Sequence, residues 1–426
     1  MLMKKTVSFS QKVKAFFKVL GPGLITGASD DDPSGIATYS QAGAGFGLST
    51  LWTAVVTFPL MATIQGMCAR IGLITQAGLT GTLKKHYHKS VLYFMLALSF
   101  PAIVLNIGAD IEAMGAVSNL LIPFIPGYVF SFVFTALLMY AIIKYPYQKI
   151  AGILKWLCIA VLVYIVVAFM AKPNWGMVLK NTFVPTIHFS KEYLSILVAI
   201  LGTTISPYLF FWQATMEAED CVHGTTKVII DKRMLSDMRK DVNTGMFFSC
   251  VVMFFITLTT GVVLFNAGIH KIDTVEQAAK ALEPLAGKSA YLLFAIGILG
   301  TGFLAIPVLA GSLSYIMAET FNWKEGLDKK FSEAKPFYIT VIVSLVVGLL
   351  LNFIGISPMK ALLYTAILYG LTAPVMIAII LHICNNKKVM GQYTNNAFQN
   401  VLGTITLVLM TAAAAALIWN EIGSWK

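Results

Sequence analysis

The sequence predicts an all-α integral membrane protein, and three observations support this class. The chain has 426 residues, of which 57% are hydrophobic and only 12% are charged, about half the charged share of an average globular protein. Its mean hydropathy is +0.77. Apolar runs of about 20 residues, the length that crosses a bilayer as a helix, recur along the whole chain. We therefore expect one multi-pass domain in the cell membrane.

Taken in order, the apolar runs predict eleven transmembrane helices. Their connections are mostly short, and the longest cover 172–193, 217–241 and 267–288. Lysine and arginine gather in cytoplasmic loops, and about three quarters of the basic residues fall inside if the N-terminus is inside. We therefore expect a cytoplasmic N-terminus and an extracellular C-terminus. The expected spans are 17–43, 48–71, 92–121, 126–144, 150–171, 194–216, 242–266, 289–318, 337–355, 359–384 and 398–419.

Two of the expected spans are interrupted. The first contains "DDDPSG", in which Asp32 precedes Pro33, and the sixth contains "GTTISPYLFFW". Proline removes a helical hydrogen-bond donor and clashes with the preceding turn, and lipid tolerates the freed backbone groups only beside a cavity or other protein. Each span opens a set of five, and interrupted helices at corresponding positions of two halves indicate a transporter's binding site. For the sixth span alone, a simple proline kink is an equal alternative.

Asp32 is the predicted charged ligand of that site. It lies near the middle of its span, where a carboxylate is costly and marks an ion or substrate path. The second break offers hydroxyl and carbonyl oxygens from Thr203, Thr204 and Ser206. Neither break contains a cysteine or histidine, and an all-oxygen site suits hard cations such as magnesium, calcium and manganese. We expect a divalent cation as transported substrate and no cofactor.

Several segments resemble the Nramp divalent-metal transporters. "LGPGLITGASDDDPSGIATYSQAGAGFGLSTLW" is similar to their first span, whose signature is Asp-Pro-Gly-Asn, and "GTTISPYLFFWQA" to their sixth, whose signature is Met-Pro-His-Asn. "MATIQGMCARIGLITQAGL", "GADIEAMGA" and "NNKKVMG" match further family segments. The resemblance implies a LeuT-type fold with helices 1 and 6 interrupted. It consists of two inverted five-span repeats, at about 17–171 and 194–384, plus an extra span at about 398–419.

The metal-binding positions depart from the family pattern. Asp32 is retained, and Thr203 matches a position whose backbone carbonyl binds metal. Gly35 stands where the family has an asparagine ligand, and Ser206 replaces the methionine whose sulfur favours transition metals. This pattern resembles the Nramp-related magnesium transporters. That resemblance implies a wider site for Mg²⁺, and also Mn²⁺, in which the ion keeps part of its water.

Three further positions differ from the family. Tyr208 and Gln213 replace two histidines of the sixth span, and Thr372 falls where the tenth span has a glutamine. Neither tyrosine nor glutamine titrates near neutral pH, and a proton path through a membrane needs titratable groups in series. We therefore expect transport that is not coupled to protons.

The remaining carboxylates near the breaks leave alternatives open. Successive helical positions diverge by about 100°, so Asp30 and Asp31 cannot both face the same site as their neighbour; a role in the inner vestibule and a structural role are equally compatible. At most one of Asp110 and Glu112 faces the path, and Glu112 is favoured by its spacing to Gly115. Four acidic residues at span ends are expected to be solvated: Glu217, Glu219, Asp220 and Asp241.

Three other functions compete with this prediction. A proton-coupled Mn²⁺/Fe²⁺ transporter of the main Nramp branch is opposed by the missing methionine and histidines. A sodium-coupled amino-acid carrier is opposed by Asp32, which would repel a substrate carboxylate. No nucleophile–base motif supports an enzyme, and no soluble domain supports a receptor. The net charge of +11 is explained by basic loops rather than nucleic acid, and the expected partners are a divalent ion and the bilayer, with a monomer compatible.

Overall fold

The computed structural model describes residues 21–146, 149, 152, 162–222 and 231–423. Every regular element within these residues is helical, and nine helical segments are long and apolar enough to cross a membrane. The prediction of an all-α membrane protein is therefore confirmed. Eight of the segments are α4 (Trp52–Thr75), α6 (Lys89–Leu121), α7 (Gly127–Lys144), α13 (Lys232–Val263), α16 (Ala290–Phe321), α17 (Lys335–Leu351), α18 (Pro358–Asn385) and α20 (Ala397–Gly423).

The first and sixth spans are interrupted, as predicted. The first consists of α2 (Pro22–Asp30) and α3 (Pro33–Phe46), and the sixth, which is the ninth apolar segment, consists of α11 (Lys191–Thr204) and α12 (Pro207–Val222). In both spans a proline opens the second helix, where its missing N–H and fixed φ cost nothing. Half of the expected fifth span lies outside the described residues, which show its end as α9 (Val163–Met170).

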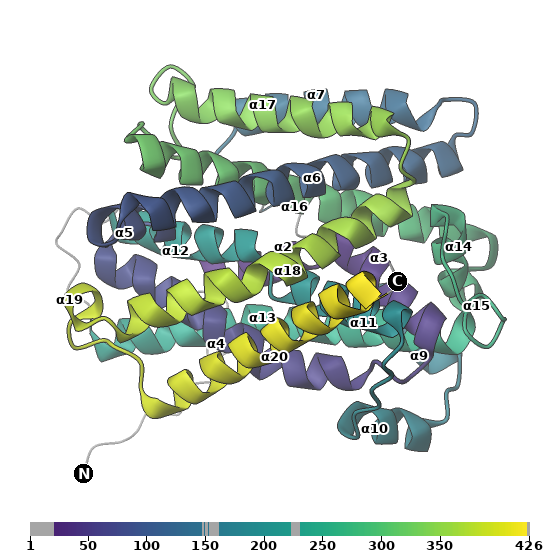
Figure 1. Cartoon of the computed structure of the whole chain (residues 1–426). Helices are drawn as coiled ribbons and strands as arrows, with labels where there is room; N and C mark the ends of the chain where they lie inside the picture. Colours follow the sequence, from purple (N-terminus) through teal and green to yellow (C-terminus); the bar gives the residue numbers. More distant parts are fainter. Residues whose placement is uncertain (1–20, 147–148, 150–151, 153–161, 223–230, 424–426) are drawn as a thin grey trace, which may run out of the picture.

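The long helices run side by side, and short helices mark the two ends of the bundle (Figure 1). At one end lie α5 (Leu79–His86) and α19 (Lys387–Met390), which carry basic residues in their last turns. At the other lie α10 (Trp175–Phe183), α14 (Val275–Ala279) and α15 (Glu283–Ala286). This separation agrees with the predicted alternation of the spans. That the α5/α19 end faces the cytoplasm stays a prediction from the basic residues.

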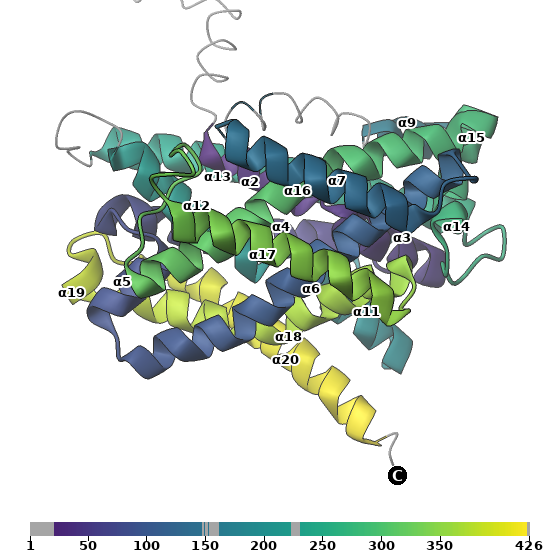
Figure 2. The ribbon, with the colours of Figure 1, turned by 90° about the horizontal axis from the view of Figure 1, so that it is seen from above.

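The interrupted helices lie inside the bundle. Helix α13 packs against both α2 and α3, and α11 packs against α18. Helices α7 and α17 cover one side of the bundle over α6 and α16, while α20 lies outside α18, α11 and α4 (Figure 2). The breaks are therefore shielded from lipid by complete helices, which is the setting that irregular backbone requires at membrane depth.

Glycines allow the interrupted helices to approach their neighbours at backbone distance. A Cβ atom on Gly27 of α2 would overlap the backbone of Gly245 in α13, and one on Gly43 of α3 would overlap Gly261 in the same helix. Small residues at such positions let membrane helices pack closely. Both halves of the first span are thus held against the single helix α13.

Candidate metal site

Asp32 lies at the junction of α2 and α3 and is only 2% exposed. It is the N-cap of α3, and its Oδ1 accepts a hydrogen bond from the backbone N–H of Gly35 at 2.7 Å. Its Oδ2 accepts a hydrogen bond from Nδ2 of Asn106 in α6 at 2.9 Å. Capping is favoured here because the first N–H groups of a helix lack partners within the helix. The carboxylate is thus fixed in place with acceptor capacity left on both oxygens.

The second break lies beside the first. A Cβ atom on Gly35 would be 3.5 Å from the hydroxyl oxygen of Thr203, which lies in the last turn of α11. The Ser206 hydroxyl donates to the carbonyl of Thr203 at 2.5 Å and to that of Gly202 at 3.1 Å. Thr203 and Ser206 are 2% and 1% exposed. The structure therefore brings Asp32, Gly35 and Thr203 together, while the Ser206 hydroxyl turns toward the end of its own helix.

The donors at the two breaks are oxygen atoms. Among the described residues, no group of three or more His, Cys, Asp or Glu side chains is arranged to hold a metal ion. One carboxylate with neutral carbonyl and hydroxyl oxygens suits a hard cation that keeps some of its water, because such a set leaves coordination positions to be filled. The chemistry of the site thus fits a passing ion rather than a fully caged one.

Asp110, rather than Glu112, lies in the same group of contacts as Asp32. Asn106 approaches Oδ2 of Asp110 at 3.5 Å while it donates to Asp32, and Asp110 is fully buried. Glu112 is partly exposed. Asn106 is not among the site residues predicted from the sequence, although its position four residues before Asp110 places the two on one face of α6. This spacing of four residues is the sequence pattern that could have predicted Asn106 as a site residue.

Asp30 and Asp31 contact a different helix from Asp32. The hydroxyl of Ser249 in α13 donates to Oδ2 of Asp30 at 2.6 Å and approaches Oδ1 of Asp31 at 3.4 Å. Asp30 faces the breaks through its backbone carbonyl, which would lie 3.3 Å from a Cβ atom on Gly35. The three consecutive aspartates therefore do not converge, as their helical spacing requires.

The residues at the family's histidine and glutamine positions make structural contacts. The Tyr208 hydroxyl donates to the carbonyl of Ser29 at 3.0 Å, and Gln213 accepts from the Thr26 hydroxyl at 2.6 Å. Both bonds join α12 to α2. Thr372 donates only to carbonyls within α18 among the hydrogen bonds of the described residues. It is buried, but its hydroxyl is engaged within its own helix.

Two acidic residues that were expected to be solvated are buried. Asp241 is 2% exposed and accepts from the backbone N–H groups of Gly21, Gly23 and Leu24 at 2.8, 2.6 and 3.2 Å. Glu217 is 7% exposed and accepts from Gln213 at 3.0 Å. The expectation that Asp241 and Glu217 are solvated was therefore wrong. Backbone N–H groups take the place of water at Asp241, and the side-chain amide of Gln213 does so at Glu217. Asp241 in particular matches the partial positive charge of a helix N-terminus.

Comparison with known proteins agrees with this geometry. The sequence pattern of the family described as "Natural resistance-associated macrophage protein-like" (Nramp) matches residues 23–420. The divalent metal cation transporter MntH of Caldanaerobacter subterraneus is 24% identical over 410 residues, with 94% of this chain and 93% of the relative covered. MntH of Clostridium acetobutylicum is also 24% identical, with 98% and 94% covered.

Solved structures support the same fold. A mutant of the Eremococcus coleocola manganese transporter superposes with a TM-score of 0.75 at 16% identity, covering 97% of this chain and 88% of the other. Mhp1, a nucleobase-cation-symport-1 family transporter in a closed conformation, superposes with a TM-score of 0.54 at 15% identity, covering 93% and 92%. The fold is thus LeuT-like, as predicted. Because the family pattern spans nearly the whole chain and includes both breaks, this protein belongs to the Nramp family of transporters.

Proposed function

We propose that the protein moves divalent metal cations across the membrane by alternating access, with the ion held between the two helix breaks. The observation that carries this proposal is the position of Asp32, whose buried carboxylate lies at one break and bonds to Gly35, which lies next to Thr203 of the other break. A carboxylate inside a membrane bundle marks an ion path. Membership of the family and the names of the relatives support a metal ion as the substrate.

Manganese is the ion that agrees both with the oxygen ligands of the site and with the names of the relatives. The relatives are named divalent metal cation transporters, and the solved structures are of a manganese transporter, which favours Mn²⁺ over Mg²⁺. Oxygen ligands suit Mn²⁺ and Mg²⁺ alike. The missing asparagine and methionine, at Gly35 and Ser206, support Mg²⁺ as a second substrate. The relatives thus support the substrate of the main Nramp branch, Mn²⁺ or Fe²⁺, better than they support transport specific to Mg²⁺.

The repeat organisation belongs to the same proposal. We place one repeat at about 17–171, its inverted counterpart at about 194–384 and the extra helix at about 398–419. The interrupted pairs α2/α3 and α11/α12 each open one of these units. Inverted repeats of this kind bind their substrate at the interface between the repeats.

Uptake by purified protein in proteoliposomes tests this function. Mn²⁺, Mg²⁺ and Cd²⁺ are offered separately, and Mg²⁺ is also added together with Mn²⁺ to measure competition. Alanine is the control solute, and protein-free vesicles give the background. We expect Mn²⁺ uptake that saturates, competition by Mg²⁺ and no alanine uptake. Saturable alanine uptake without uptake of any metal would reject the proposal in favour of an amino-acid carrier.

A further inference from the structure

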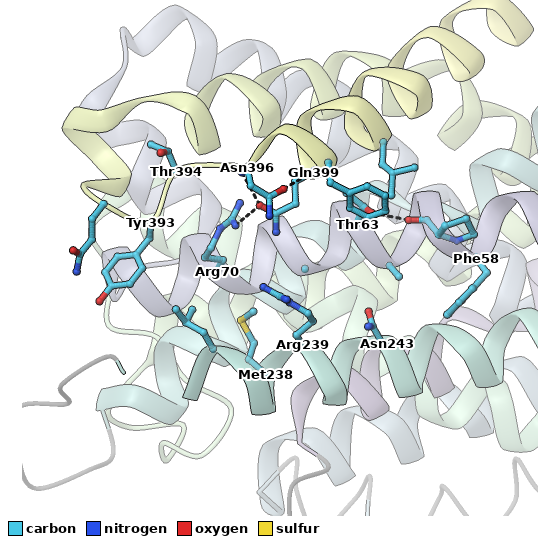
Figure 3. Close-up of a pocket in the computed structure, with 17 residues that line it drawn as sticks. Phe58, Thr63, Arg70, Met238, Arg239, Asn243, Tyr393, Thr394, Asn396 and Gln399 are labelled. Atoms are coloured by element: carbon cyan, nitrogen blue, oxygen red, sulfur yellow. Dashed lines mark hydrogen bonds between the residues drawn. The ribbon is translucent and has the colours of Figure 1, made fainter. Parts of the chain in front are cut away.

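A cavity lies between α4, α13, α20 and the segment that leads into α20, and no residue of either helix break lines it (Figure 3). Its volume is about 470 Å³, which is in the range of small-molecule sites. It opens at the α5/α19 end of the bundle, since it includes Gln392, Tyr393 and Thr394 of the segment after α19. Neither the fold nor the proposed transport of metal ions accounts for it.

The polar part of this cavity carries a positive charge without a carboxylate partner. Arg70 of α4 is only 7% exposed; its Nη1 donates to Gln399 at 2.7 Å and its Nη2 donates to Asn395. Both partners are neutral amides, and Nε of Arg70 has no hydrogen-bond partner among the described residues. A buried charge without a counter-ion is costly. Its described neighbours therefore leave the charge of Arg70 uncompensated, which favours an anionic ligand beside it.

A second arginine lies across the same cavity. Arg239 comes from α13, and it lines the cavity together with Arg70 of α4 (Figure 3). Two carboxylates lie two positions from it in sequence, and both have other partners: Asp237 pairs with Arg233 and Lys240, and Asp241 accepts from the first N–H groups of α2. No aspartate or glutamate occurs among the residues that line the cavity. Two guanidinium groups, which can each bind a phosphate through two hydrogen bonds, thus face one space.

The other part of the cavity is mainly apolar and extends along α4, away from the α5/α19 end. Phe58 lies twelve residues before Arg70 on α4, which is about 18 Å along a helix. Leu402 of α20 adds to this wall, whereas Phe398 lies in the first turn of α20, nearer the α5/α19 end, and is 69% exposed. Between the two parts lies Gly66, where an added Cβ atom would meet nothing within 4 Å. The two arginines therefore lie nearer the α5/α19 end, and beyond them apolar side chains predominate, with Thr63 and Asn243 as polar members of the lining.

We propose that this cavity binds an anionic glycerophospholipid from the leaflet at the α5/α19 end. The lipid phosphate lies between Arg70 and Arg239, and an acyl chain lies along Phe58 and Leu402. Basic pockets between transmembrane helices are known to hold anionic lipid head groups. A free phosphate would neutralise the arginines but leave the apolar wall uncovered, and a zwitterionic lipid would leave the positive charge uncompensated.

The bound lipid joins three helices of the bundle. Helix α13 packs against both halves of the first span, and α4 packs against α12. Lipid binding therefore stabilises the folded protein through the helices that surround the metal site, without contact to that site. Because a ligand that binds only the folded state raises its stability by mass action, thermal unfolding reports the binding.

The test is thermal unfolding of the full chain in neutral detergent, with native mass spectrometry as a second readout. Phosphatidylglycerol, phosphatidylcholine and soluble glycerol phosphate are added separately. We expect phosphatidylglycerol alone to raise Tm and to remain bound in the spectrometer. An equal rise with phosphatidylcholine would show a non-specific lipid effect, and an equal rise with glycerol phosphate would show an ion site; either result overturns the proposal.

Matched variants assign the effect to the cavity. Gly66→Phe fills the open floor, and Arg239→Gln removes one charge; we expect each to weaken phosphatidylglycerol binding at least tenfold. Arg233→Gln is the control, since Arg233 lies on the same helix but its side chain is 89% exposed and does not line the cavity. If Gly66→Phe fails to fold, lipid binding by Arg239→Gln still tests whether the cavity is the binding site. Binding by Arg239→Gln as tight as that of Arg233→Gln would contradict the proposed site.

Discussion

The Asp32 carboxylate serves two groups of partners at once. Its Oδ1 caps α3 through Gly35, and its Oδ2 is held by Asn106, so its rotamer is set before any ion arrives. A ligand fixed in this way loses little conformational freedom on binding. Both oxygens keep lone pairs for a cation. The cap and the proposed ligand role are therefore compatible, and they can be separated by mutation.

We expect Asp32→Asn to keep the fold and to lose the ion. Asparagine is as good an N-cap as aspartate, so α3 should still begin at Pro33. The lost charge should weaken Mn²⁺ binding at least tenfold, about 1.4 kcal/mol. Calorimetric titration of the detergent-solubilised protein measures this, with Asp31→Asn as the control because Asp31 approaches Ser249 of α13 instead. Near-normal Mn²⁺ affinity in Asp32→Asn would remove Asp32 from the site.

Selectivity is tested by restoring the family's side chains in the double variant Gly35→Asn, Ser206→Met. A Cβ atom on Gly35 would lie 3.4 Å from the ring of Tyr39 and 3.5 Å from the Thr203 hydroxyl, so the added groups occupy the space between the breaks. Thioethers favour softer metals, and Mg²⁺ gives up water reluctantly. We expect Mg²⁺ transport to be lost while Mn²⁺ and Cd²⁺ transport remain. Competition between Mg²⁺ and Cd²⁺ measures the change, and an unchanged preference would show that these positions do not set selectivity.

At the scale of helices, α2 depends on a residue far away in the sequence. Its N-cap, Gly21, provides no side-chain cap, and Asp241 of α13 takes over that role for three backbone N–H groups. An acidic group at this end also interacts favourably with the helix dipole. The end of α2 is thus attached to α13 by hydrogen bonds as well as by packing.

We expect Asp241→Ala to loosen this end of α2 while the bundle stays folded. Three N–H groups lose their acceptor, so the first turn should fray and become accessible to water. A single cysteine at position 24, in a background without the five native cysteines, should react faster with a water-soluble thiol reagent. Asp237→Ala is the control, because Asp237 pairs only with neighbours on α13 in the described structure. Equal reaction rates in both variants would contradict the attachment.

The sequence could predict the helices better than their contacts. The breaks at Asp32 and Ser206 were predictable because proline and charge act locally on the helix that contains them. The partners of these breaks were not, since Asn106 is 74 positions from Asp32 and no periodicity links the two. For the same reason Asp241, which lies near a span end, was expected in water rather than at the start of α2. A local sequence pattern therefore predicts where a helix begins, ends or breaks, but it does not predict which distant residue the helix contacts.

At the scale of the whole molecule, the distribution of titratable groups bears on coupling. Helix α17 has no Asp, Glu, Lys, Arg or His after Lys335, and Tyr208 and Gln213 join α12 to α2 where the family has histidines. Asp110 is the carboxylate that shares Asn106 with Asp32. A proton relay needs several such groups in sequence. The described hydrogen bonds link Asp32 to one further titratable group, Asp110, since Asp30 and Asp31 contact Ser249 of α13 instead.

We therefore expect metal uptake without stoichiometric proton movement. Proteoliposomes that contain a pH-sensitive dye and a metal-sensitive dye should report Mn²⁺ entry with no matching acidification. Protein-free vesicles with an ionophore provide the control for passive proton leakage. Acidification that follows the amount of Mn²⁺, and is lost in Asp110→Asn, would instead support the proton-coupled main-branch mechanism.

Stability should also depend on pH through the segment between α16 and α17. Burial, followed by the nearby charges of Glu319 and Glu219, raises the pKa of Glu325 to about 8. The folded state then holds a proton that an unfolded glutamate releases near its usual pKa of about 4.3. The free energy of unfolding therefore falls as pH rises from about 4.3 to about 8 and levels off above that range. Tm measured from pH 5 to 9 should fall less in Glu325→Gln than in the exposed control Glu333→Gln, and parallel curves would contradict this.

The close contact of both halves of the first span with α13 limits how the protein can change shape. Gly27 and Gly43 lie on opposite sides of the break, and each meets the backbone of α13, at Gly245 and Gly261. If α2 or α3 moved away from α13 by itself, it would lose these close backbone contacts. Glycine has no side chain that could extend to keep them. Widening the break requires one half to slide along α13, or α13 to bend between these two glycines. For the alternating access proposed above, we therefore expect α2, α3 and α13 to move together rather than α2 or α3 alone.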